Sequence, residues 1–206
     1  MNILSIESSS IVCGTALYLK DNLVDIDEVT MPRIHGERLP VMIETILKKN
    51  DLEVSDLDGI AISAGPGSYT GLRIGMSLAK GLAVAVGIPI IPVPTLEAIN
   101  RGVSREGLYW VVLHSHKNII YAQRFNSGRP DSEVECAEFD SKRYTYPVGF
   151  NLDVVCKPKE YEIASPSSQY VCELAIEHFN QWAEINLNTI TPNYVTNFNL
   201  GKVSTN

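Results

Sequence analysis

The stretch AGPGSYTGLRIG, residues 64–75, joins a short apolar run to a long apolar segment and decides how the first half of the chain folds. The run before it, GIAIS (59–63), is typical of a buried strand. The segment after it predicts a helix over residues 71–86. The proline and glycines between them predict a tight turn, and Ser68 or Thr70 can cap the helix. Glycine-rich turns that open a helix often bind phosphate, so the role of these glycines has to be established.

Neither common phosphate-binding motif fits this turn. A Walker A loop that starts at Gly65 needs its second glycine where Thr70 stands, and Gly71 is followed by Leu72 instead of lysine. The dinucleotide fingerprint G-x-G-x-x-G matches Gly65 and Gly67, but its third glycine is displaced to Gly71. An anion at the helix N-terminus stays possible. We favour a packing role for the glycines.

The predicted helix carries a row of small side chains at i+4 spacing, formed by Gly71, Gly75, Ala79, Ala83 and Gly87. Glycine inside a helix costs about 1 kcal/mol relative to alanine, and a close approach of another backbone is the usual compensation. The rest of the helix is apolar on nearly all sides, which is typical of a helix that is central in its own fold or covered by a partner. We predict that another subunit covers it.

The flanking sequence predicts a mixed sheet with helices. In chain order the elements are strands at 3–7, 12–19 and 23–29, a helix at 35–50, the strand at 59–63, the helix at 71–86, a strand at 88–93 and a helix from Thr95. Residues 109–125 repeat the opening pattern of strand, polar hairpin and strand, which suggests a second, related lobe. We therefore predict an N-terminal lobe at 1–102 and a smaller, divergent lobe at 103–206, which includes an amphipathic helix within 167–185.

Composition limits the possible functions. The chain has 206 residues, 45% of them hydrophobic, and a formal net charge of −7. Scattered basic residues on an acidic chain argue against binding nucleic acid unaided. The N-terminus lacks the pattern of a signal peptide, no stretch is suited to spanning a bilayer, and the four cysteines show no paired spacing, so we expect a cytoplasmic protein with reduced thiols.

Four segments together resemble the TsaB (YeaZ) family in order and spacing. They are ILSIESSS (3–10), RIHGERLP (33–40), AGPGSYTGLRIGMSLAKGLA (64–83) and GIPIIPVPTLEAI (87–99). The resemblance is strong over residues 1–100. Beyond that only IIYAQRF (119–125) and TPNYV (191–195) look similar.

The resemblance implies the two-lobed actin, sugar-kinase and Hsp70-like fold, an α/β, ribonuclease H-like architecture of mixed sheets flanked by helices. It implies a non-catalytic scaffold that pairs with a TsaD-type catalytic subunit, works with a TsaE-type ATPase, and forms a homodimer when alone. The complex modifies tRNA with threonylcarbamoyl-adenosine next to the anticodon, so tRNA is reached only through the complex. No cofactor, metal or membrane contact is implied.

The packing pattern and the family interface coincide on the same two helices, because TsaB proteins pair through their first two helices. The predicted interface residues are Leu39, Met42, Ile43, Ile46, Gly71, Gly75, Leu78, Ala79, Leu82 and Ala83.

Three histidines and one acid are the other candidates for chemistry. His35 stands where TsaD has the first histidine of a metal-binding H-x-x-x-H pair, but Leu39 replaces the second, so we expect a structural role. His114 and His116 would point the same way on a strand, but no third ligand is evident. They stand where relatives carry DAR-like residues.

Glu7 stands where families of this fold commonly have an aspartate. The alternative function is therefore a small ATP-dependent enzyme of the kinase-like fold that uses Glu7 and the cleft between the lobes. A peptidase is disfavoured, because the serines at 8–10 have no paired histidine nearby.

Overall fold

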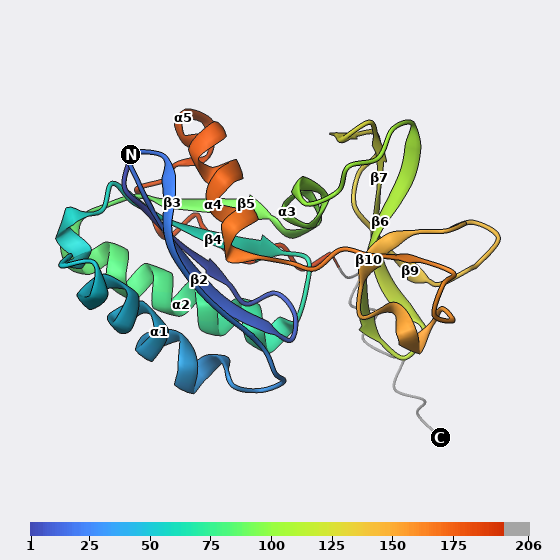
Figure 1. Cartoon of the computed structure of the whole chain (residues 1–206), viewed down its shortest axis with the longest axis horizontal. Helices are drawn as coiled ribbons and strands as arrows, with labels where there is room; N and C mark the ends of the chain where they lie inside the picture. The colour runs from blue at the N-terminus through green and yellow to red at the C-terminus, as the bar shows by residue number, and fades with distance from the viewer. Residues whose placement is uncertain (196–206) are drawn as a thin grey trace, which may run out of the picture.

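The first sheet has the strand order of a ribonuclease H-like lobe. The computed structural model describes residues 1–195. Its N-terminal sheet has the order β3-β2-β1-β4-β5, and β1 pairs antiparallel with β2 but parallel with β4 (Figure 1). The strands are β1 (Ile3–Glu7), β2 (Val12–Leu19), β3 (Asn22–Thr30), β4 (Gly59–Gly65) and β5 (Ile90–Pro94). The predicted β-β-β-α-β-α-β order is confirmed.

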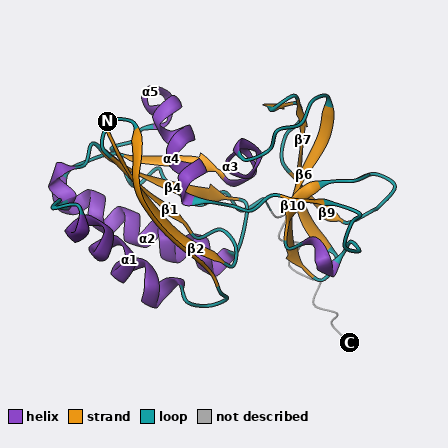
Figure 2. Ribbon diagram, in the orientation of Figure 1, coloured by secondary structure: helices purple, strands orange, loops and turns teal. Residues whose placement is uncertain are grey.

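Helices cover both faces of this sheet (Figure 2). The four main ones are α1 (His35–Lys49), α2 (Tyr69–Val86), α3 (Thr95–Arg101) and α4 (Ser168–Glu177). Side chains that alternate along β1 separate two core clusters: Leu4 and Ile6 face α1 and α2, whereas Ile3 faces α4. Because β1 is buried on both faces, the N-terminal core is continuous around it.

The second sheet begins with the hairpin that the sequence predicted. Its strand order is β11-β10-β6-β7-β8, and β9 also pairs with β7. The strands are β6 (Leu108–His116), β7 (Ile119–Asn126), β8 (Arg129–Pro130), β9 (Glu135–Glu138), β10 (Val148–Phe150) and β11 (Glu162–Ile163).

Short helical turns lie at η1 (Val54–Asp56), η2 (Leu152–Val154) and α5 (Phe179–Trp182). No helix in residues 1–195 is long and apolar enough to cross a membrane.

Helix α4 lies on the first sheet, although the sequence predicts that residues 103–206 form a second lobe. Figure 1 shows α4 beside the strands of the first sheet. Its buried residues Val171, Cys172 and Ala175 belong to one core cluster with Ile3 and Ala61. The reason is that α1 and α2 cover only one face of the first sheet, and the apolar face of α4 covers the other. Residues 196–206 of the predicted lobe lie outside the described residues.

The segment at 184–195, called the strap below, returns along the first lobe. Glu184 forms two backbone hydrogen bonds with Ile90. The Lys80 Nζ donates to the Ile190 carbonyl at 2.6 Å, and the Asn193 amide donates to the Ala64 carbonyl at 2.7 Å. Ile190 of the strap belongs to the same core cluster as Ala79 and Ala83 of α2, so the strap covers part of the apolar surface for which the sequence predicts another subunit.

Four residues of the small-residue row of α2, Gly71, Gly75, Ala79 and Ala83, face the interior of their own chain and not another subunit, whereas Gly87 is the exposed C-cap of the helix. A Cβ atom at Gly71 would collide with the Ser8 carbonyl, and one at Gly75 with the Ser8 hydroxyl. Ala79 and Ala83 are 0% and 1% exposed. The row lets α2 approach β1, so the prediction that these four residues contact a partner is corrected. The i+4 spacing correctly predicts that another segment approaches α2 closely, but it does not identify that segment.

The predicted interface residues of α1 are also internal. Leu39, Met42 and Ile46 are at most 2% exposed and belong to the core cluster between α1 and the first sheet. They recur at helical spacing because that face of α1 lies on the sheet. Of the remaining predicted interface residues, Ile43 is 4% exposed and Leu78 and Leu82 are half-buried. Pairing through these two helices stays a prediction, but its contact residues must lie on their outer surface.

Candidate functional site

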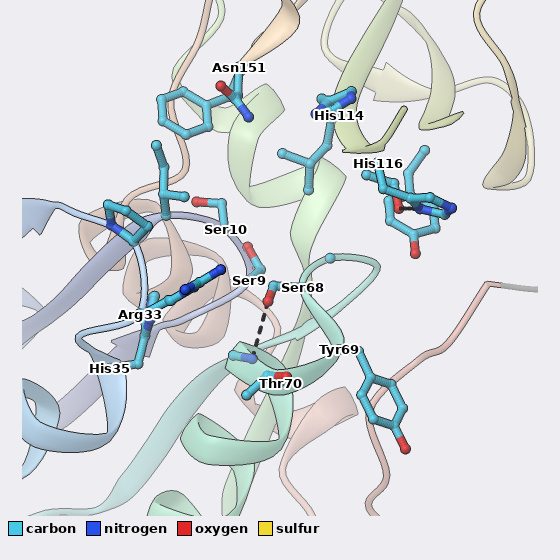
Figure 3. Close-up of a pocket in the computed structure, with 18 of the residues that line it drawn as sticks. Ser9, Ser10, Arg33, His35, Ser68, Tyr69, Thr70, His114, His116 and Asn151 are labelled. Atoms are coloured by element: carbon cyan, nitrogen blue, oxygen red, sulfur yellow. Dashed lines mark hydrogen bonds between the residues drawn. The ribbon is translucent and has the colours of Figure 1, made fainter. Parts of the chain in front are cut away.

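A cleft of about 760 Å³ separates the two sheets (Figure 3). The first lobe contributes the β1–β2 turn, the loop before α1 and the first turn of α2; the second contributes the β6–β7 hairpin and the end of β10. The strap contributes Tyr194, whose ring lies 5.0 Å from that of Tyr69. The polar and aromatic residues that line the cleft are Ser9, Ser10, Arg33, His35, Ser68, Tyr69, Thr70, His114, Ser115, His116, Tyr121, Phe150, Asn151 and Tyr194.

The glycines of residues 64–75 allow the turn before α2 to pack on the β1–β2 turn. The Ser68 amide donates to the Ser9 carbonyl at 2.6 Å, and a Cβ atom at Gly67 would collide with that same carbonyl. Ser68 is the N-cap, since its hydroxyl accepts from the Gly71 amide at 3.2 Å. Of the two caps that the sequence allowed, the structure has Ser68. The packing interpretation of these glycines is confirmed, with the β1–β2 turn as the neighbour.

Two of the three histidines that line the cleft, His35 and His114, are hydrogen-bonded to backbone carbonyls, and His116 Nδ1 lies 3.1 Å from the Ser115 hydroxyl. His35 is 5% exposed and its Nε2 lies 3.0 Å from the Val12 carbonyl, which agrees with the structural role predicted for it. His114 Nε2 lies 2.9 Å from the Lys117 carbonyl. The strand register shifts between His114 and His116, so the simple alternation that would align the two rings does not apply. Within residues 1–195, no three His, Cys, Asp or Glu side chains gather as a metal site.

Glu7 lies beneath the cleft and does not line it. Its side chain is 0% exposed, and Oε1 accepts from the Ser9 amide and the Ser9 hydroxyl, both at 2.6 Å. Oε2 has no hydrogen-bond partner in the described chain. Burial raises the pKa of Glu7 to about 7, against the opposing effect of the Ser9 hydrogen bonds. The glutamate therefore shapes its own turn, and its carboxylate does not face the cleft.

A second feature is an apolar groove of about 660 Å³ on the outer side of α1 and α2, called the helix groove below. Its lining residues are Pro40, Ile43, Glu44, Leu47, Lys48, Asp51, Leu52, Glu53, Val54, Leu78 and Leu82. Ile43, Leu78 and Leu82 are the predicted interface residues that reach this surface. The contribution of residues 51–54 was missed, because two apolar residues in a charged connection give no periodic signal.

The family model and the relatives that match this chain agree with one another. The family model described as tRNA N6-adenosine threonylcarbamoyltransferase (TsaD) matches residues 30–186. The TsaB protein of Buchnera aphidicola is 31% identical over 160 residues, which cover 69% of this chain and 72% of the relative. Bacillus subtilis TsaB is 34% identical over 147 residues, covering 68% and 64%.

Other relatives align over a shorter region. Escherichia coli TsaB is 36% identical over 106 residues, covering 52% of this chain and 46% of the relative, so the match spans about half of that protein. The structure of YeaZ from Pseudomonas aeruginosa superposes with a TM-score of 0.75 at 20% identity, covering 94% of this chain and 99% of that one. This likeness supports the predicted fold. With the family model matching most of the chain, the comparisons show that the chain belongs to the TsaB (YeaZ) family.

Proposed function

We propose that this chain is a non-catalytic scaffold that pairs with a TsaD-type catalytic subunit and, with a TsaE-type ATPase, enables threonylcarbamoyl-adenosine modification of tRNA next to the anticodon. The names of the relatives, tRNA threonylcarbamoyladenosine biosynthesis proteins, support the pathway. The observation that carries the scaffold role is the helix groove, because an apolar groove between two outer helices fits a helix of another subunit.

The shape and the apolar lining of the helix groove fit a helical partner. Leu78 and Leu82 lie one turn apart on α2 and stay half-buried, while Pro40 and Ile43 face them from α1. Helices pack at axial distances of roughly 8–10 Å, so a partner helix can seat its side chains between α1 and α2. The same surface would pair two copies when the chain is alone, which accounts for the proposed homodimer.

The cleft supports a subunit without chemistry of its own. No aspartate or glutamate is among the described residues that line the cleft. Glu7 lies below the surface of the cleft, where its Oε1 accepts hydrogen bonds from the Ser9 amide and hydroxyl. An ATP-dependent enzyme that used Glu7 would need this carboxylate in contact with the bound nucleotide. The net charge of −7 also disfavours binding of tRNA by the chain alone, so we propose that tRNA is bound through the complex.

Leu78→Asp is expected to weaken pairing with the TsaD-type subunit of the same organism by roughly tenfold or more, because a carboxylate would be buried in an apolar contact. Titration calorimetry with the two purified proteins measures this, and modified adenosine formed in a reconstituted reaction is expected to fall in parallel. The matched control is Val84→Asp, on the same helix, where the side chain is 69% exposed and lies outside the helix groove. Unchanged pairing by folded Leu78→Asp would contradict the proposed docking surface.

A further inference from the structure

We propose that the helix groove binds an amphipathic helix whose apolar face is flanked by basic side chains, and that it binds such a helix more tightly than a second copy of this chain. This inference rests on the proposed docking surface and adds the chemistry of its occupant. Helices α1 and α2 lie side by side on one face of the first sheet (Figure 1), and residues of both line the helix groove. The apolar floor fits a helix, and the charged rim selects which helix.

The apolar floor of the helix groove has the length of about two helical turns. Along α1 it extends from Pro40 to Leu47, a distance of roughly 10 Å at the rise of an α-helix. Leu78 and Leu82 of α2 lie opposite, are half-buried, and are spaced by one turn. An amphipathic helix that presents apolar side chains at the same spacing can cover this floor.

The rim of the helix groove carries unbalanced negative charge. Its charged residues are three acids and one lysine, namely Glu44, Asp51, Glu53 and Lys48. The Lys48 ammonium lies 2.5 Å from the Glu44 carboxylate, so the cation among these residues already has a partner. Asp51 and Glu53 are exposed and form no ion pair within residues 1–195. Two acids of the rim can therefore pair with an incoming molecule.

The unpaired acids lie at one end of the helix groove. Asp51 and Glu53 follow directly after α1, and Lys49, the last residue of that helix, is already in an ion pair. Leu52 and Val54 alternate with the two acids and are half-buried in the lining. A lysine or arginine of the bound helix can lay its aliphatic stem on such apolar residues and place its charge beside the carboxylates. The arrangement therefore favours a helix with basic residues beside its apolar face.

The same charge disfavours a second copy of the chain. A two-fold contact through the helix groove would bring two rims of the same sign into one interface. Like charges across an interface weaken binding, and salt screens this repulsion. Self-association is therefore expected to be absent or to strengthen as salt is added, whereas a basic helix should bind less tightly.

Synthetic peptides test the occupant on the full chain without the natural partner. Two of them form a helix with the same leucine face, flanked by lysines in one and by glutamates in the other. The third is a scrambled lysine peptide without an apolar face. Calorimetry at low salt is expected to show the lysine helix binding roughly tenfold or more tightly than the other two. Equal binding of the lysine helix and either of the others, or no binding of it below about 1 mM, would overturn the proposal.

Asp51→Asn combined with Glu53→Gln removes the two unpaired charges and keeps the size of both side chains. Asparagine also accepts the φ of 54° at residue 51. This double variant is expected to bind the lysine helix roughly five- to tenfold less tightly than the wild type. The control is Glu106→Gln with Glu133→Gln, the same change of charge on exposed residues outside the helix groove, and it should stay within about twofold of the wild type. Equal losses in the two double variants would show a general effect of net charge and refute the role of the rim.

Two further measurements separate this inference from the proposed function. Analytical ultracentrifugation of the wild type at low and high salt reports self-association, and a dimer that is tighter at low salt would assign the helix groove to a second copy and overturn the proposal. Leu78→Asp is expected to lose the lysine helix. If that variant lost the peptide but kept its pairing with the TsaD-type subunit, the proposed docking surface would be wrong, while the preference of the helix groove for a basic helix would stand.

Discussion

Gly71→Ala is expected to lower the free energy of unfolding by about 3 kcal/mol, even though alanine is the better helix former. The added methyl group would collide with the backbone carbonyl of Ser8, directly after β1. A carbonyl cannot turn aside as a side chain can, so α2 or the β1–β2 turn would have to move. The β1–β2 turn and the first turn of α2 both line the cleft, so the displacement would also change the shape of the cleft.

Gly81→Ala is the matched control for this prediction. It lies in the same helix, but a Cβ atom at this position would meet nothing within 4 Å. The change should therefore raise the free energy of unfolding by about 1 kcal/mol through helix propensity alone. Urea unfolding followed by circular dichroism measures both variants against the wild type. If both alanines were stabilising, Gly71 would not be packed against β1, and the small-residue row would again be available to a partner.

The order of elements in the first lobe could be predicted from the sequence because each strand and helix carries its own period. Strand β1 is a short, mostly apolar run that is buried on both faces, and α1 repeats apolar residues every three to four positions. The turn before α2 could also be predicted, since its proline, glycines and serine act locally. These signals do not depend on distant parts of the chain.

What faces the small-residue row could not be predicted, because spacing within a helix carries no information about its neighbour. Gly71 requires a close approach, and Ser8 supplies it from 63 positions earlier in the chain (71 − 8). The cleft has the same difficulty: Arg33, Tyr69, His114 and Tyr194 come from four separate segments that only the tertiary structure assembles. The strap was missed for a related reason, since it has neither helical nor strand periodicity of its own.

The stability of the protein is expected to fall by about 3 kcal/mol between pH 4 and pH 8 through Glu7 alone. Burial raises the pKa of Glu7 from its ordinary value of 4.5 to about 7 in the folded protein. Between these two values the unfolded chain has already lost the proton that the folded chain still holds. Stability contributed by the protonated form is therefore complete below about pH 4.5 and is lost as the pH rises through about 7.

Glu7→Gln tests this dependence, because the amide has the shape of the protonated acid and keeps an oxygen for the Ser9 donors. Urea unfolding across this pH range should show the variant losing about 3 kcal/mol less than the wild type. Glu37→Gln is the control, since Glu37 is an exposed acid in the first turn of α1 and should leave the wild-type pH dependence in place. If wild type and Glu7→Gln instead changed in parallel, Glu7 would have to be charged and solvated in the folded protein. That result would return Glu7 to the cleft as a group able to take part in chemistry, and it would weaken the case for a non-catalytic subunit.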